Sequence, residues 1–168
     1  MKATDVLADG FGRIREEVHQ VLDGLSDEQL HARVDPAANS IAWLVWHLAR
    51  VQDIQVAAPA GLEQVWHSQG WDERFGLPLP ADATGYGHSP EEAGKVRASG
   101  DLLGGYYDAV HEQSLTWLRT LTAAELERVV DRHWDPPVTL GVRLVSILAD
   151  DLQHVGQAAY VRGLLERR

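Results

Sequence analysis

The chain has 168 residues, no cysteine, and a formal net charge of −10 from 25 acidic and 15 basic side chains. The absence of cysteine excludes disulfides, thiolate zinc fingers, iron–sulfur clusters and a cysteine nucleophile, so any metal must be bound through nitrogen and oxygen. The acidic balance, with no basic cluster to offset it, opposes binding to the phosphates of a nucleic acid.

No segment has the roughly 18 uninterrupted apolar residues that a membrane span requires. The N-terminal stretch carries charges where a signal peptide would be apolar. We therefore expect a cytoplasmic protein with no membrane partner. The length suits a single domain over residues 1–168, with a core large enough to fold alone.

The first half of the chain predicts two long helices, because apolar residues recur there in steps of three and four. The first covers about residues 4–25, and a short polar helical turn over 27–34 follows it. The second runs from Ile41 to about Ala58, with Asn39 or Ser40 as its N-cap. It is apolar around much of its circumference, as expected for an element buried at the centre of a bundle.

The segment over about residues 59–89 is rich in glycine, proline and tryptophan and has no sustained period. A connection of this length in a compact domain usually has a function, or covers the core as an ordered crossover. Ser89 and Glu92 then form a capping box, and Pro90 occupies the first helical position. This signature predicts a long third helix over about residues 91–121.

The last part of the chain predicts a fourth long helix. Thr122 with Glu125 repeats the capping-box signature and predicts a short helix, and residues 128–134 are expected to be extended or irregular. Thr139 begins the last helix, which runs to about Leu165. With no credible strand alternation, these elements predict an all-α four-helix bundle in which a long crossover joins the second and third long helices.

Three polar side chains share one stripe of the last helix, since Asp150, His154 and Gln157 are separated by steps of four and three. Two residues four apart on a helix can both bind one ion, which makes Asp150 and His154 a candidate metal pair. Asp151 precedes His154 by three residues. Because an acid-x-x-His pair also binds metals in helical bundles, Asp151 is the competing carboxylate.

The second helix supplies a third candidate ligand, His47, on its inward stripe, while the charged Arg50 and Asp53 are expected on other faces. A buried imidazole needs partners for its ring nitrogens. Two imidazoles and one carboxylate, with a fourth position open, form the ligand set of catalytic zinc. The alternative from spacing alone is that backbone carbonyls or water satisfy the histidines, and that Asp150 and His154 are an ordinary helix-surface pair.

The segments SIAWLVWHLARVQD (40–53) and LADDLQHVGQAAYVRGLL (148–165) resemble the DinB-like superfamily. The closest resemblance is to its metal-dependent thiol S-transferases, which are related to mycothiol-dependent maleylpyruvate isomerase. The likeness extends over nearly the whole chain and includes WDPPVTLGVRLVSIL (134–148). It implies a four-helix bundle in which a histidine on the second helix and a His/Glu/Asp-x-x-x-His pair on the last bind a metal, often zinc or nickel.

Matched residue by residue, the resemblance places the metal ligands at His47, Asp150 and His154, and the following Gly-Gln at Gly156 and Gln157. Many relatives have histidine at the position of Asp150. This departure keeps a ligand but removes about one positive charge from the site. The implied ion is divalent, with zinc as the first choice and nickel, iron or manganese as alternatives.

The resemblance also implies an activity, a transfer that uses a low-molecular-weight thiol such as mycothiol, and the lack of cysteine agrees with it. An open zinc site binds an external thiol, lowers its pKa and orients the thiolate for attack on a small electrophile, in detoxification or isomerisation. The alternatives are a non-catalytic metal-binding protein of stress response or regulation, and a helical interaction protein. Relatives commonly form homodimers, although the sequence alone presents no interface signature.

Three further residues of the last helix are candidates for contacts at such a site. Gln157 is expected to hold the second ring nitrogen of a ligand histidine. Tyr160 is a candidate hydrogen-bond donor, with packing as its alternative. Arg162 is a candidate contact for a polar part of the thiol, with an exposed helix-end arginine as its alternative.

The aromatic and remaining histidine residues are less specific. Either of two tryptophan pairs is a candidate pocket wall, with core packing or loop anchoring as the alternative: Trp43 with Trp46, and Trp66 with Trp71. The other histidines have no partner at ligand spacing and are predicted to lie at the surface or in loops. If any of these histidines lies near the site, His111 on the third helix and His67 in the crossover are the first candidates.

Overall fold

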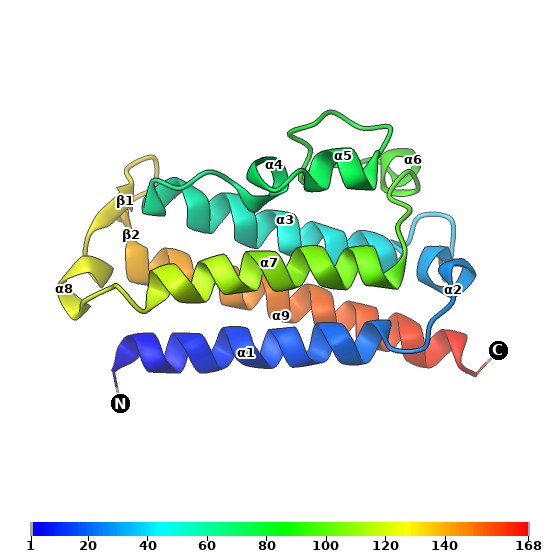
Figure 1. Ribbon diagram of the computed structural model, residues 1–168, viewed down its shortest axis with the longest axis horizontal. Coiled ribbons are helices and arrows are strands. Elements are labelled where there is room, and N and C mark those ends of the chain that lie inside the picture. Colours follow the sequence, from blue (N-terminus) through cyan, green and yellow to red (C-terminus); the bar gives the residue numbers. More distant parts are fainter. Residues whose placement is uncertain (1, 168) are drawn as a thin grey trace.

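The computed structural model describes residues 2–167, and four long helices form a bundle as the sequence predicts (Figure 1). α1 and α3 each pack against both α7 and α9, so they occupy opposite corners of the bundle. Among residues 2–167, no helix is long and apolar enough to cross a membrane. The elements in chain order are α1 (Ala3–Leu22), α2 (Asp27–His31), α3 (Ile41–Ala60), α4 (Val65–Ser68), α5 (Trp71–Phe75), α6 (Pro90–Ala93), α7 (Gly100–Leu118), α8 (Ala123–Leu126), β1 (Val129–Asp131), β2 (Val138–Thr139) and α9 (Leu140–Leu165).

The capping signals place the ends of α3 and α9 where the sequence predicts. The Ser40 side chain accepts a hydrogen bond from the backbone N–H of Trp43 at 3.2 Å and so caps α3. Gly61 ends α3 in the left-handed conformation that glycine adopts without steric cost. Thr139 caps α9 in the same way as Ser40 caps α3. Each cap fixes the residue at which its helix begins. The caps thereby help to set the heights at which His47 of α3 and His154 of α9 lie along the bundle.

Two details differ from the prediction. The helix expected over residues 91–121 is broken into α6 and α7, because the chain leaves α6 at Gly94 and a new N-cap, Ser99, begins α7. The segment expected to be irregular contains β1, which pairs with β2 in a short antiparallel hairpin. Strands of two or three residues are too short to produce a detectable alternation in the sequence.

The prediction that Arg50 and Asp53 project away from the core is wrong, because both side chains are fully buried under the crossover. One Asp53 oxygen accepts the N–H of Val65 at 2.9 Å, and the other accepts the N–H of Trp66 and the hydroxyl of Tyr106, each at 2.8 Å. These bonds replace the water that the carboxylate loses on burial. Asp53 therefore fixes the start of α4 to the middle of α3.

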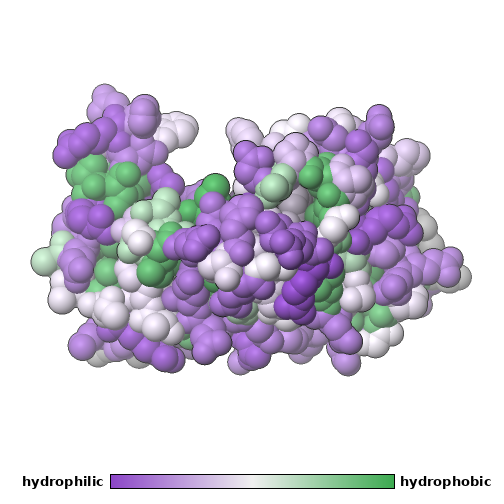
Figure 2. All heavy atoms as spheres, turned by 45° about the horizontal axis from the view of Figure 1, so that its top comes forward, coloured by the Kyte–Doolittle hydropathy of each residue, from purple (hydrophilic) through white to green (hydrophobic). Residues whose placement is uncertain are grey.

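Arg50 fixes the far end of the same crossover. Its guanidinium donates to the Gln64 side chain at 3.0 Å and to the Ala83 carbonyl at 3.1 Å, and it lies 4.8 Å from the centre of the Trp66 ring. Figure 2 shows the crossover and the β1–β2 hairpin standing above the bundle with a notch between them. The crossover expected from the sequence is therefore an ordered cover, attached to α3 at two buried charges.

We expect Asp53→Ala to lower the free energy of unfolding by about 3–5 kcal/mol, because it leaves the buried Arg50 charge without its counter-charge and three donors without an acceptor. Urea denaturation followed by circular dichroism measures this change. Asp9→Ala is the control, since the partner of Asp9 within residues 2–167 is the exposed Arg13, and it should leave the unfolding midpoint unchanged. Equal effects of the two substitutions would contradict the anchoring role.

Candidate metal centre

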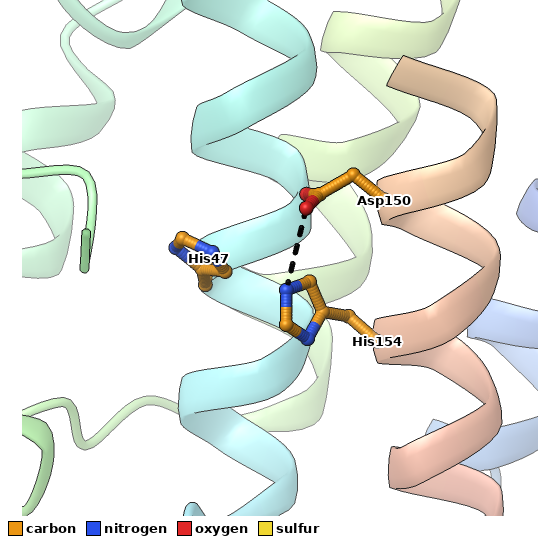
Figure 3. A group of neighbouring side chains, drawn as sticks. All are labelled: His47, Asp150 and His154. Atoms are coloured by element: carbon orange, nitrogen blue, oxygen red, sulfur yellow. Dashed lines mark ion pairs between the residues drawn. The ribbon is translucent and has the colours of Figure 1, made fainter. Parts of the chain in front are cut away.

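The structure brings His47, Asp150 and His154 together between α3 and α9 (Figure 3). Each offers one potential ligand atom, and these atoms all lie within 4.8 Å of one another. The two imidazole rings meet edge to face with their centres 4.7 Å apart. Residues separated by more than half of the chain therefore converge on one point.

The His47 ring is held in one orientation by the crossover. Its Nδ1 donates a hydrogen bond to the Thr84 carbonyl at 2.5 Å, and the Trp43 ring stacks on it with a centre-to-centre distance of 4.5 Å. Burial lowers the pKa of His47. The hydrogen bond to the Thr84 carbonyl raises this pKa in part, and the nearby His154 ring lowers it further. Because Nδ1 carries the proton of the neutral ring, Nε2 keeps its lone pair for a metal.

The His154 ring is oriented by its own helix. Its Nδ1 and the Gln157 side-chain oxygen are 3.0 Å apart, and because that oxygen can only accept, Nδ1 is the donor. The opposite nitrogen, Nε2, faces Asp150 (Figure 3), with 3.7 Å between Nε2 and Oδ1. Gln157 thus contacts His154 in the way expected for a residue that holds a metal ligand.

The donor set fits a cation. The 3.7 Å separation of Asp150 and His154 is too long for a hydrogen bond. The second Asp150 oxygen is buried and has no hydrogen-bond partner within residues 2–167. Because each histidine places its ring proton on the far nitrogen, lone pairs converge here with no proton between them, an arrangement that a divalent ion would stabilise.

Asp151, the competing carboxylate, lies outside this cluster. It is fully buried, and neither carboxyl oxygen finds a hydrogen-bond partner in the described part of the chain. Burial raises the pKa of Asp151 well above its usual value, and the nearby Asp150 raises it further. The raised pKa favours the protonated carboxyl group, a form unsuited to metal binding.

The two remaining candidates of α9 are not held at the cluster. The Tyr160 side chain is 67% exposed. Arg162 donates to the carbonyls of Gln20, Val21 and Asp23, at 2.6, 3.1 and 2.8 Å, and so satisfies the C-terminal end of α1. The guanidinium is thus engaged in a structural contact, and the expected contact of Arg162 with a thiol has no support in this geometry.

Of the four tryptophans in the two candidate pairs, Trp43 is the one that contacts a residue of the cluster in the described structure. Trp43 covers one side of His47, and the ring of Trp46 stacks at 5.9 Å on His88. Trp66 and Trp71 instead pack around Tyr106 in the core.

The two histidines that the sequence analysis named as candidate neighbours of the site have partners elsewhere. His67 pairs with Asp72 at 3.0 Å, and His111 lies against Tyr107 inside the bundle. His88 of the crossover is nearer, because its Nδ1 accepts the indole N–H of Trp43 at 3.2 Å. Neither Thr84 nor His88 lies at a ligand spacing from the other site residues, so the sequence pattern did not indicate them.

Gly85 allows the crossover to approach His47. Its φ of +94° is in the region that favours glycine, and a Cβ there would lie 2.6 Å from His47 Nδ1 and 3.0 Å from the Trp43 ring. Gly87 also has a positive φ, of +73°, but a Cβ there would meet nothing within 4 Å in the described structure. The two glycines thus share the same backbone requirement and differ in the space around them.

We expect Gly85→Ala to lower the free energy of unfolding by about 1–3 kcal/mol more than Gly87→Ala does, because only the first forces a methyl group against a packed ring. Chemical denaturation of the two variants measures the difference, and the shared backbone strain cancels in the comparison. Equal destabilisation would show that the His47 ring is not confined by the crossover.

Asp151 gives a pH-dependent prediction. Its pKa is raised in the folded state, so above the unfolded value of about 3.9 the unfolded chain releases a proton that the folded chain retains. Stability therefore falls with rising pH by about 1.4 kcal/mol per pH unit until the folded pKa is reached.

Asp151→Asn removes the titrating carboxyl group and with it this fall in stability. The free energy of unfolding of the variant, measured relative to the wild type, should therefore rise between pH 5 and 7. Urea denaturation of metal-free protein at several pH values checks the expectation. Parallel stability–pH curves for the two proteins would contradict it.

Comparisons with known proteins identify the family of this chain. A family model described as mycothiol-S-transferase matches residues 6–167. A crystal structure of a conserved protein from Enterococcus faecalis has 36% sequence identity and a TM-score of 0.93, covering 100% of this chain and 99% of that chain. No curated protein matched. Because the family model spans nearly the whole chain, this chain belongs to the mycothiol S-transferase family, as its DinB-like sequence features predict.

Proposed function

We propose that this chain is a metal-dependent transferase that joins a low-molecular-weight thiol, mycothiol as the first candidate, to a small electrophile. The observation that carries the proposal is the convergence of His47, Asp150 and His154 with both Nδ1 atoms engaged by oxygen acceptors. Family membership supports the transferase class, and the lack of cysteine means that the reacting sulfur must come from a cosubstrate.

His47, Asp150 and His154 would hold one divalent ion, with zinc as the first candidate and nickel, iron or manganese as alternatives. When bound, the ion would supply Lewis acidity and lower the pKa of an incoming thiol. Because only one of the three ligands is anionic, the loaded site keeps one positive charge in excess. This balance favours a singly charged anionic cosubstrate such as a thiolate.

The surrounding residues leave one side for the cosubstrate. Trp43 and the crossover cover His47, whose exposed fraction is 6%, whereas the Asp150 side chain is 38% exposed. Access is therefore from the α9 side. A groove of about 430 Å³, within the size range of small-molecule sites, lies further along α9 and is lined by Ala38, Asn39, Leu44, Gly156, Gln157, Tyr160 and Val161. None of the three candidate ligands lines it, but Gln157, which contacts His154, does.

In the proposed reaction the sulfur of the thiol forms a bond to an electrophilic carbon. The electron pair of the broken bond moves to the electrophile, either onto a ring-opened oxygen or onto a leaving group. The thiol proton ends on that oxygen or passes to solvent. Gln157 links the two parts of the site, since it orients His154 and also lines the groove.

The test is to measure metal content and turnover on the same protein. We expect about one divalent ion per chain and consumption of mycothiol with a model electrophile such as a bimane reagent. His154→Ala should lose both the metal and the turnover, because it removes a ligand from α9. His133→Ala is the matched control, since the His133 side chain is 95% exposed in the β1–β2 region, and it should retain both.

A His154→Ala protein that has lost its metal but keeps full turnover would contradict the proposal. Stoichiometric metal with no turnover across a panel of thiols and electrophiles would favour the non-catalytic metal-binding alternative. Metal-free protein whose melting temperature does not respond to added zinc or nickel would favour the helical interaction protein.

A further inference from the structure

The indole ring of Trp43 contacts both candidate histidine ligands. It lies nearly parallel to the His47 ring, with 16° between the planes and 4.5 Å between the centres. It meets the His154 ring edge to face, at 84° and 6.1 Å. Because His47 is on α3 and His154 is on α9, this one ring touches both sides of the junction at which the ligands converge.

The crossover holds the Trp43 ring in place. The indole N–H donates to His88 Nδ1 at 3.2 Å. A Cβ at Gly85 would lie 3.0 Å from the ring, so the backbone there packs directly against the indole. Gly85 and His88 belong to one tight turn, since the backbone N–H of His88 donates to the Gly85 carbonyl at 3.1 Å. The indole is therefore a fixed surface against which the two imidazoles rest.

A fixed indole face interacts differently with a free and a metal-bound imidazole. The face of the ring carries partial negative charge, and tryptophan is the side chain whose ring attracts cations most strongly. An imidazole that binds a divalent ion takes on part of the positive charge of the ion. The stacked contact with Trp43 therefore stabilises the His47 ring more strongly when an ion is bound than without it.

The indole contacts also reduce the rearrangement that metal binding requires. Each imidazole is already oriented by an oxygen acceptor on Nδ1, which is Thr84 for His47 and Gln157 for His154. The stacked indole limits the remaining motion, which is displacement of the His47 ring as a whole. Ligands that are held near their bound positions lose less conformational freedom on binding.

We propose that Trp43 is a positioning residue of the metal centre, whose indole face holds the His47 ring and strengthens the binding of a divalent ion. His88 acts one step further out, because it fixes the indole and contacts the centre through it. The inference rests on the metal site of the proposed function. It is independent of which thiol and which electrophile the protein uses.

The zinc affinity of full-length variants, measured by competition with a coloured chelator, tests this role. Trp43→Leu should raise the zinc dissociation constant about 5- to 30-fold, the range of a desolvated cation–π contact. Trp43→Phe should recover part of the loss, because it restores an aromatic face. Trp71→Leu is the matched control, since Trp71 is also 6% exposed but packs against Tyr106, and it should bind zinc as the wild type does. Circular dichroism checks that each variant is folded.

Equal zinc dissociation constants for Trp43→Leu and the wild type would overturn the proposal. Equal losses of affinity in Trp43→Leu and Trp71→Leu would also overturn it, because they would show a general effect of core packing. A wild-type chain that binds neither zinc nor nickel would contradict the proposed function and this inference together. Failure of the inference alone is therefore distinguishable from failure of the proposed function.

Tryptophan fluorescence gives a second measurement, which does not require the Trp43→Leu protein to fold. Paramagnetic nickel quenches indole emission at short range. We expect nickel to quench the wild type and to quench Trp43→Phe less, because the removed indole contacts both histidine ligands. Trp134→Phe is the control, since Trp134 is 67% exposed between β1 and β2, and its quenching should match the wild type. Unchanged quenching in Trp43→Phe would place the ion away from Trp43 and overturn the proposal.

Discussion

The hydrogen bond from the His47 ring to the Thr84 carbonyl determines how the candidate metal centre is built. It fixes the proton on Nδ1 and so directs the lone pair of Nε2 toward α9. This bond requires the crossover backbone to lie against the ring, which Gly85 permits because it has no Cβ. The chemistry of the site therefore depends on the path of a loop as much as on the helices that carry the ligands.

The buried charges of α3 explain how a loop can maintain so exact a contact. Asp53 and Arg50 replace lost hydration with hydrogen bonds to both ends of the crossover segment, at Val65 and at Ala83. Removing any one partner leaves a buried group unsatisfied, which gives the network its rigidity. The last anchored residue, Ala83, directly precedes Thr84. The anchor and the acceptor of the His47 proton are thus adjacent in the chain.

The helical framework and the pairing of Asp150 with His154 were predictable from local patterns, because periodicity, caps and ligand spacing are properties of neighbouring residues. The assignment of the distant His47 to the same site came from the family resemblance, since no local pattern shows that α3 meets α9 there. The break between α6 and α7, the β1–β2 hairpin, and the burial of Arg50 and Asp53 were not, since each depends on contacts between distant segments. A charged residue on a helix is read as exposed unless its tertiary partners are known.

His47 and Asp150 lie in opposite halves of the sequence, on helices whose remaining contacts are mostly apolar packing. An ion shared by them would act as a removable cross-link of the folded state, because the unfolded chain would have to close a loop of most of its length to bind the same ion. Metal binding and the folding stability of the bundle would then be linked, so that an increase in one increases the other. Cellular metal supply would set the lifetime of the protein together with its capacity to act.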